Sequence, residues 1–412
     1  MAMQTSSHLI IVAQLRRIVL AAVVLVVATS TTFAIPQFSA LSGNRCSNCH
    51  VAPHGGGLRS ETGWYSYYDV GLISRENAAV KWLYDLDESN SYLGGMLTAG
   101  MDFRIQNTRS FSSDAAKRVT FPMQASLYAA LTPISGVTLE GSFNLAALRT
   151  SASGSKVAYP GQRDGHFSAI IKPDNAWPSL RLGLFRPGVG VRYDDHTVFP
   201  GSLMTSIGRQ PLLAPNWAEY GAELNYEGLK WLTLTAGVFG TGALSQLQVP
   251  TGSGVVQALA NDESPLLVAK AVLWPRMFND MLNVYVGGSV LATEGYSMVN
   301  TFMGAGITDN LSLTADLLLM KTDDIVSTRS GMVELTYQVT PEILPFVRWE
   351  GASTTFDALK ANGADDDVVY AGVFGAHVFV LPYVVLRPEY RMWDTRLPGT
   401  TSRWNFQLYV FY

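Results

Sequence analysis

The chain has 412 residues, of which 48% are hydrophobic, 15% are charged and 37 are glycines. That is too apolar for an ordinary soluble enzyme, whereas a mean hydropathy of +0.14 is low for a bundle of membrane helices. The net charge of −4 comes without any cluster of Lys and Arg, so the chain has no basic surface for nucleic acid and we expect no nucleic-acid partner.

The N-terminus has the three parts of a secretory signal peptide. Arg16 and Arg17 supply the positive charge, 18–28 is an apolar stretch, and Thr32-Phe33-Ala34 places small residues before a cut after Ala34. The apolar stretch is shorter than the roughly 20 residues that cross a bilayer. We therefore expect residues 1–34 to be a cleaved signal peptide and the mature chain to be exported.

A Cys-x-x-Cys-His pentad, Cys46 to His50, follows the signal. Cys46 and Cys49 are the only cysteines of the sequence, which excludes a four-thiolate zinc site, and the βαβ pattern of a thioredoxin-like dithiol is missing. Two thiols at this spacing form thioethers with the vinyl groups of a haem, and the adjacent imidazole binds the iron. The pentad predicts one covalent haem c, attached through Cys46 and Cys49 with His50 as an axial ligand of the metal.

The second axial ligand stays open in the sequence. A methionine raises the haem potential and a second histidine lowers it. The candidates are His54, Met96 and Met101, with His166, His196 and His377 behind them.

Residues 35–90 form a short, polar segment rich in turn-forming residues, too poor in aliphatic side chains to build a large core. We expect a haem-bearing plug. Gly55 to Gly57 either let the backbone pass close to a porphyrin or simply form a loop. The aromatic run 64–68 is either a wall inside a pore, next to the haem edge, or a membrane-interface or packed cluster. The spacing of apolar residues predicts one helix over 77–86.

From residue 91 the pattern changes to runs of about ten residues in which apolar and polar side chains alternate, as in a transmembrane β-barrel. In the last run, Trp404, Phe406, Leu408, Val410 and Tyr412 would face lipid, while Arg403, Asn405 and Gln407 would line the lumen. A soluble sandwich would have a less apolar outer face. The expected fold is therefore all-β: an outer-membrane antiparallel barrel over 91–412, in contact with lipid.

Sixteen such runs are present, beginning near Leu93, Thr120, Gly136, Asp164, Ser179, Trp217, Trp231, Pro265, Leu282, Ser297, Leu311, Ser327, Leu344, Asp367, Tyr383 and Ser402. Short turns alternate with long connections, as expected when both chain ends are periplasmic. The long outer connections include 107–119, 147–163, 188–216, 242–264 and 354–366. The acidic groups in two of them, 194–196 and 365–367, are expected to be solvated loop residues.

A short haem segment followed by a barrel of about 16 strands resembles the fused monohaem cytochrome–porin family, which includes the outer-membrane iron-oxidising cytochromes. Ala34, Pro36 and Phe38, then Gly43 and the pentad, stand where that family has its Ala-x-Pro-x-Phe, Gly and Cys-x-x-Cys-His. Ser39 to Ser42 replace the family's Ala-Arg-Gln-Thr-like run.

The resemblance implies an electron-transfer protein that oxidises extracellular Fe(II) and passes electrons to a periplasmic c-type cytochrome. Because the apolar band of such a barrel is about 25 Å tall, we expect the haem to lie in the lumen or at its periplasmic mouth. Two alternatives remain: a diffusion porin with a tethered cytochrome, and the same conduit working outward to reduce external acceptors.

Overall fold

The computed structural model describes residues 36–84, 89–111, 117–145, 161–174, 176–191, 198–205, 208–214, 216–250, 256–258, 260, 263–277, 282–395 and 401–412. The expected signal peptide, 1–34, lies outside these residues. Within the described ranges, no helix combines the length and the apolar character needed to cross a bilayer.

The chain folds into a closed antiparallel barrel of 16 strands, which confirms the expected fold class and count. Each predicted run corresponds to one strand, with starts that differ by a few residues. The strands are β2 (Leu97–Phe111), β3 (Lys117–Ile134), β4 (Val137–Asn144), β5 (Gly165–Ile171), β6 (Ser179–Phe185), β9 (Glu219–Leu229), β10 (Leu232–Phe239), β13 (Leu266–Leu273), β15 (Leu282–Thr293), β16 (Tyr296–Thr308), β17 (Leu311–Thr322), β18 (Val326–Tyr337), β19 (Ile343–Phe356), β20 (Asp367–Leu381), β21 (Val384–Thr395) and β22 (Thr401–Phe411).

Each strand pairs with its neighbours along the chain, and the last strand pairs with the first. β22 lies antiparallel to β2, from Asp102 opposite Phe411 to Phe111 opposite Ser402. Closure matters because an open sheet edge would expose unpaired backbone groups to hydrocarbon.

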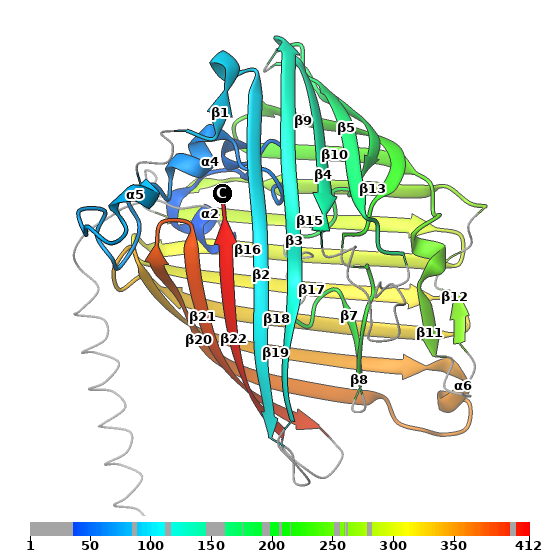
Figure 1. The fold of residues 1–412 in the computed structure, drawn as a ribbon. Coiled ribbons are helices and arrows are strands. Elements are labelled where there is room, and N and C mark those ends of the chain that lie inside the picture. Colours follow the sequence, from blue (N-terminus) through cyan, green and yellow to red (C-terminus); the bar gives the residue numbers. More distant parts are fainter. Residues whose placement is uncertain are drawn as a thin grey trace, which may run out of the picture.

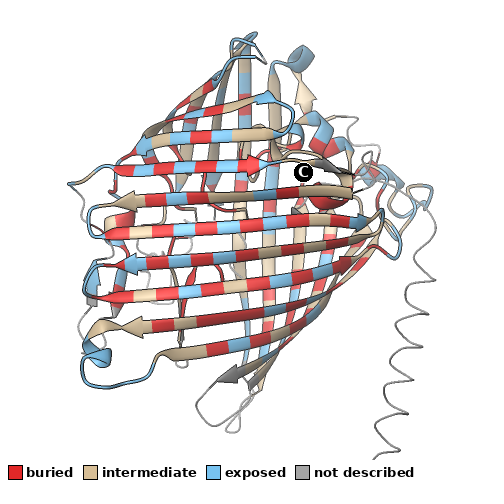
Figure 2. Cartoon of the chain, turned by 180° about the vertical axis from the view of Figure 1, so that it is seen from behind, coloured by how far each residue is buried: buried red, intermediate tan, exposed pale blue. Residues whose placement is uncertain are grey.

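The two faces of the wall differ as the alternation predicts (Figure 2). On β17, Leu317 and Leu319 are 48% and 47% exposed on the outer face, while Asp316 and Met320 are buried on the inner face. Period-two patterning thus produces an apolar outer surface and a polar lumen.

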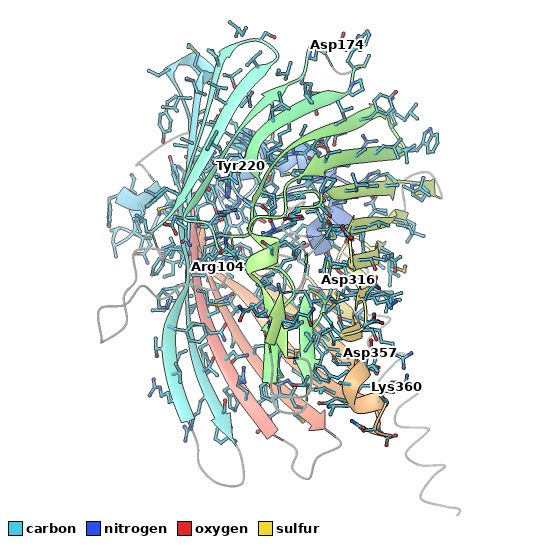
Figure 3. All side chains as sticks on the ribbon, turned by 90° about the vertical axis from the view of Figure 1, so that its right-hand side faces the viewer. Arg104, Asp174, Tyr220, Asp316, Asp357 and Lys360 are labelled. Atoms are coloured by element: carbon cyan, nitrogen blue, oxygen red, sulfur yellow. The ribbon has the colours of Figure 1, made fainter. Side chains whose placement is uncertain are left out.

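Short turns gather at one end of the barrel and the long connections at the other. In Figure 3, Asp174 of the β5–β6 turn lies at one end, whereas Asp357 and Lys360 of α6 (Asp357–Lys360) lie at the opposite end. This agrees with the predicted alternation of turn lengths.

Residues 36–84 occupy the short-turn end of the lumen, beside the C-terminus (Figure 1). We call these residues the plug. Phe38, Tyr67 and Val70 of the plug pack with Phe379 and Phe411 of the wall in one buried apolar cluster. The helices of the plug are α2 (Pro36–Ser42), α3 (Cys46–Cys49), α4 (Glu61–Tyr65) and α5 (Lys81–Tyr84); η1 (Leu93–Gly95) and β1 (Ser91–Tyr92) lead into β2.

The expected helix over 77–86 is reduced to the single turn α5, with residues 85–88 outside the described part. Trp64 and Tyr67 of the aromatic run are buried against the wall: Trp64 stacks on Tyr383 at 5.2 Å and meets Tyr412 edge-on at 5.8 Å. The prediction that Tyr412 faces lipid is therefore wrong, because this last ring turns at the rim to contact the plug.

The described residues of the long connection between β6 and β9 fold into the lumen, so for them the prediction of an outer loop over 188–216 is wrong. Val198, Phe199, Leu203 and Leu212 are each at most 2% exposed, and burial of these side chains explains the inward path. We call residues 186–218 the inward connection. Its hairpin is β7 (Ser202–Thr205) with β8 (Gly208–Pro211); η3 (Leu244–Gln246), β11 (Gln248–Pro250) and β12 (Val256–Ala258) follow β10, and β14 (Arg276–Met277) pairs with β15.

A lipid-facing charge tests the assignment of the two faces. Leu317→Arg, near the middle of β17, should lower the free energy of unfolding by about 2–4 kcal/mol, because the guanidinium must enter hydrocarbon. The matched control is Leu359→Arg, which makes the same change at an exposed leucine of α6. Urea unfolding in lipid vesicles measures both, and equal stability of the two variants would contradict the assignment.

Candidate functional site

The pentad forms a one-turn helix within the plug. Cys46 and Cys49 are three residues apart in α3, so both thiols project from one side of the helix. Neither is in a disulfide; Cys46 is half-buried and Cys49 is buried. Burial, together with nearby Cys46, raises the pKa of the Cys49 thiol. His50 ends the helix, and its N–H donates to the Cys46 carbonyl at 3.0 Å.

Contacts with the end of β9, at the short-turn end of the barrel, hold this helix in place. Ser47 Oγ donates to Glu227 Oε1 at 2.7 Å, and Arg45 donates to the carbonyl oxygens of Glu227 and Leu229 at 3.1 and 2.6 Å. Since these acceptors are the last residues of β9, before its turn to β10, the pentad is attached to the short-turn end of the wall.

The three-glycine run makes a close approach to the pentad. Gly55, Gly56 and Gly57 all have positive φ, at 78°, 76° and 61°, a region that glycine enters without strain. A Cβ on Gly55 would lie 3.0 Å from Cys46 Cβ and 3.6 Å from both Cys46 Sγ and His50 Cδ2. The missing side chain thus leaves room against the thiol and the imidazole.

These features fit a covalent haem. Neither thiol is used in a disulfide, an imidazole follows them directly, and a glycine run borders the same atoms. The contacts of Gly55 are compatible with both sequence interpretations of the glycines, passage close to a porphyrin and a simple loop. Cys46 and Cys49 would hold the porphyrin, and His50 would bind its iron.

A cavity begins at the glycine run. It lies between residues 52–58 of the plug, the walls β2 to β6 and the inward connection, and is partly open to solvent. We call it the lumen chamber. The polar side chains on its walls include Arg104, Gln124, Tyr128, His166 and Arg181.

His54 is committed to the wall of the barrel. Its Nε2 lies 2.7 Å from Glu223 Oε1 of β9, and both side chains are buried. Glu223 Oε2 accepts from the Gly188 N–H at 2.9 Å, and Asn225 donates to Oε1 at 3.0 Å. One buried carboxylate therefore joins the plug, the wall and the inward connection.

The other candidates for the second axial ligand are spread over the molecule. Met101 alternates with buried Asp102 and is 38% exposed on the outer face, and Met96 is 44% exposed beside η1. His166 lines the lumen chamber, with Nε2 2.8 Å from Ser142 Oγ. His377 is buried on β20 beside Phe346, and His196 lies outside the described residues. Only His54 and His166 border the chamber among the described candidates.

Several lumen residues were not singled out from the sequence. Arg59 of the plug donates to Asp102 at 3.2 Å and to the Tyr409 hydroxyl at 2.8 Å, and Tyr409 donates to Asp102 at 2.6 Å. The polar phase of the strand alternation was the available signal. It identifies inward-facing residues but not their partners, which come from distant strands.

The opposite side of the lumen holds a buried ion-pair network. Arg348 contacts Glu334, Glu350 and Glu389 at 2.9, 2.6 and 3.4 Å, and Arg391 contacts Glu350 at 2.8 Å. Buried charges need such partners because isolated ones are costly. Of the acidic loop residues, Asp366 accepts from Thr355 at 2.8 Å; 194–196 lie outside the described residues.

No protein-family model matches the chain, and no curated protein matches it. Among solved structures, the high-pH form of Pseudomonas putida OprB is 12% identical with a TM-score of 0.54, covering 84% of this chain and 99% of OprB. The outer membrane channel DcaP of Acinetobacter baumannii is 11% identical with a TM-score of 0.51, covering 78% of this chain and 99% of DcaP. This likeness concerns the fold, which is that of outer-membrane barrels of the porin type.

The shared carboxylate makes a direct prediction. Glu223→Ala leaves the His54 imidazole and the Gly188 N–H without their acceptor, and breaking a buried pair costs about 3–5 kcal/mol. We expect faster protease cleavage of the plug in lipid vesicles and a larger single-channel conductance. The matched control is Glu76→Ala, at an exposed plug residue. If the plug of Glu223→Ala is cleaved as slowly as that of the control and the two proteins have equal conductance, this contact does not hold the plug.

Proposed function

We propose that this chain is an outer-membrane electron conduit with one covalent haem c. In this proposal Cys46 and Cys49 hold the haem, His50 binds its iron, and the protein oxidises extracellular Fe(II) and passes electrons to a periplasmic c-type cytochrome. The iron substrate and the cytochrome partner come from the resemblance to the cytochrome–porin family. The outer-membrane location is supported by the barrel fold and the apolar outer face.

The observation that carries the proposal is the position of the pentad. Its two thiols lie inside a barrel mouth, on a helix tied to the wall through Ser47 and Glu227, and beside a chamber that continues into the lumen. A redox group held there would be sheltered from lipid and accessible from the periplasmic side. When bound, the haem iron supplies reversible one-electron exchange.

The residues around the pentad have separate tasks in this proposal. Arg45 and Ser47 orient α3 against the end of β9, while Gly55 keeps the side of Cys46 and His50 open for a ring. Glu223 holds the loop that carries Gly55, through His54, against the wall. The plug, the inward connection and the ion-pair network together narrow the lumen, which favours electron transfer over free diffusion of solutes.

A second candidate is a diffusion porin whose tethered cytochrome passes no electrons outside. The lumen chamber and the porin-type fold favour it. A conduit that passes electrons outward differs from the proposed Fe(II)-oxidising conduit only in the direction of electron flow. The arrangement of residues does not distinguish the two directions.

The decisive experiment begins with the visible spectrum of the purified protein and of two variants. We expect c-type absorbance in the wild type, its loss in Cys46→Ser/Cys49→Ser, and its retention in Asn48→Ala, which keeps the Cys-x-x-Cys spacing. Wild-type protein without that absorbance would rule out the conduit in either direction.

The second part of the experiment separates the candidates. Stopped-flow spectroscopy of proteoliposomes should show haem reduction after Fe(II) is added outside, with low steady conductance in the same preparation. No reduction by external Fe(II), together with a large conductance, would favour the porin. Oxidation of prereduced haem by an external acceptor, without reduction by Fe(II), would favour outward flow.

A further inference from the structure

The pentad helix α3 is packed directly against α4, the next helix of the plug. The Ser60 N–H donates to the Cys49 carbonyl oxygen at 3.0 Å, and a Cβ on Gly63 would lie 2.0 Å from the same oxygen. A side chain at that position would collide with the backbone of the pentad, so the close approach of the two helices requires glycine. The residues that α4 presents to solvent are therefore only one helix away from the two thiols.

Three aromatic rings lead from this contact to the surface. Trp64 is buried, and its ring lies 5.7 Å from that of Tyr68. Tyr68 stacks on Tyr65, with centroids 5.6 Å apart and planes 6° apart, and Tyr65 is 63% exposed. Trp64 also stacks on Tyr383 in the β20–β21 turn, so the series lies at the short-turn end, where Figure 1 shows α4 and α5. Packed side chains thus connect the surroundings of the pentad with solvent at this end.

Arg75 joins this series to α5. Its guanidinium carbon lies 4.8 Å from the centroid of the Tyr68 ring and 5.9 Å from that of the Tyr84 ring. Trp82, in the same helical turn as Tyr84, is 60% exposed, and Leu72 is exposed as well. Large exposed aromatic and aliphatic side chains gathered in one region are typical of protein–protein interfaces. We call three residues the exposed face of the plug: Tyr65, Leu72 and Trp82.

The exposed face is surrounded by acidic residues. Between 61 and 90 the sequence has six acidic residues and two basic ones. Glu61, Asp69 and Glu76 are exposed, and one of the two basic residues, Arg75, is paired with Asp69 at 3.2 Å. Anionic lipid headgroups repel an acidic surface, whereas a protein with a basic surface is attracted and oriented by it. The charge therefore favours a basic protein over the membrane surface as the partner of this face.

From this arrangement we infer that the exposed face of the plug is the docking surface for a soluble, basic haem protein that exchanges electrons with the haem. The inference rests on the proposed function and adds to it the place where the partner binds and the charge of the partner. The aromatic and leucine side chains form the contact, while the acidic residues attract the partner. In the proposed direction, the ferrous haem of the conduit gives one electron to the ferric haem of the partner, and no bond or proton is transferred.

The test uses the full-length protein in nanodiscs of zwitterionic lipid and one probe, a basic cytochrome c whose iron is replaced by zinc. The probe fluoresces, so its anisotropy measures the affinity. Its light-excited porphyrin gives one electron to a ferric haem, so the decay of the excited state measures electron transfer. We expect faster decay when the probe is bound to the wild type than when it is mixed with Cys46→Ser/Cys49→Ser, which lacks the attachment sites.

Two variants of the exposed face are compared with matched controls. Trp82→Ser should weaken binding of the probe about tenfold, as is usual when an aromatic side chain is removed from the centre of an interface. Its control is Trp177→Ser, at a tryptophan that is 65% exposed in the β5–β6 turn of the same barrel end. Glu76→Lys should weaken binding at low salt and less at high salt, because it places a like charge opposite the probe. Its control is Asp323→Lys, at an exposed residue of the β17–β18 turn.

The outcomes separate the two proposals. Wild-type protein without c-type absorbance overturns the proposed function and this inference with it. With the haem present, equal affinities for Trp82→Ser and Trp177→Ser overturn the docking face and leave the conduit standing, and so does binding without faster decay of the excited state. If Trp82→Ser fails to assemble, as judged by heat-modifiable gel mobility, the charge variants decide: equal affinities for Glu76→Lys and Asp323→Lys at low salt overturn the inference.

Discussion

The buried carboxylate of Glu223 is the contact on which the arrangement of the lumen depends. It pairs with His54 of the plug at 2.7 Å and accepts the N–H of Gly188 from the inward connection at 2.9 Å. Because a buried carboxylate without partners is costly, the plug and the inward connection stabilise each other through the wall. The pentad and the lumen chamber keep their relative positions as a result.

Chain segments fold inside this barrel and occupy part of its lumen. The plug enters at the short-turn end, the inward connection crosses the interior, and Arg348 with its three glutamates occupies the β18–β21 side. The lumen chamber runs along β2 to β6. The barrel wall supplies the shell, while the narrowing comes from chain segments that fold inside it. Electron transfer across such a narrowed lumen is the function we propose.

The C-terminus illustrates how one sequence feature serves two purposes. Alternation along β22 directs Trp404 and Phe406 outward, as the pattern predicts for a lipid face. Tyr409 and Phe411 are the last inward-facing residues of the same strand. Arg59 of the plug donates to the Tyr409 hydroxyl and lies over the Phe411 ring, which Tyr67 of the plug also contacts edge-on. The strand that closes the barrel therefore also forms part of the seat of the plug.

Sequence alone determined the barrel, because period-two alternation and alternating turn lengths are local properties that each strand carries by itself. It also identified the pentad, a chemical signature that needs no fold to be read. Tertiary structure decided which residues meet: that Glu223 contacts His54, that the Arg104 guanidinium lies over the Tyr409 ring, that the described part of 186–218 turns inward and that Tyr412 contacts Trp64. These contacts join residues tens to hundreds of positions apart, and only closure of the barrel brings them together.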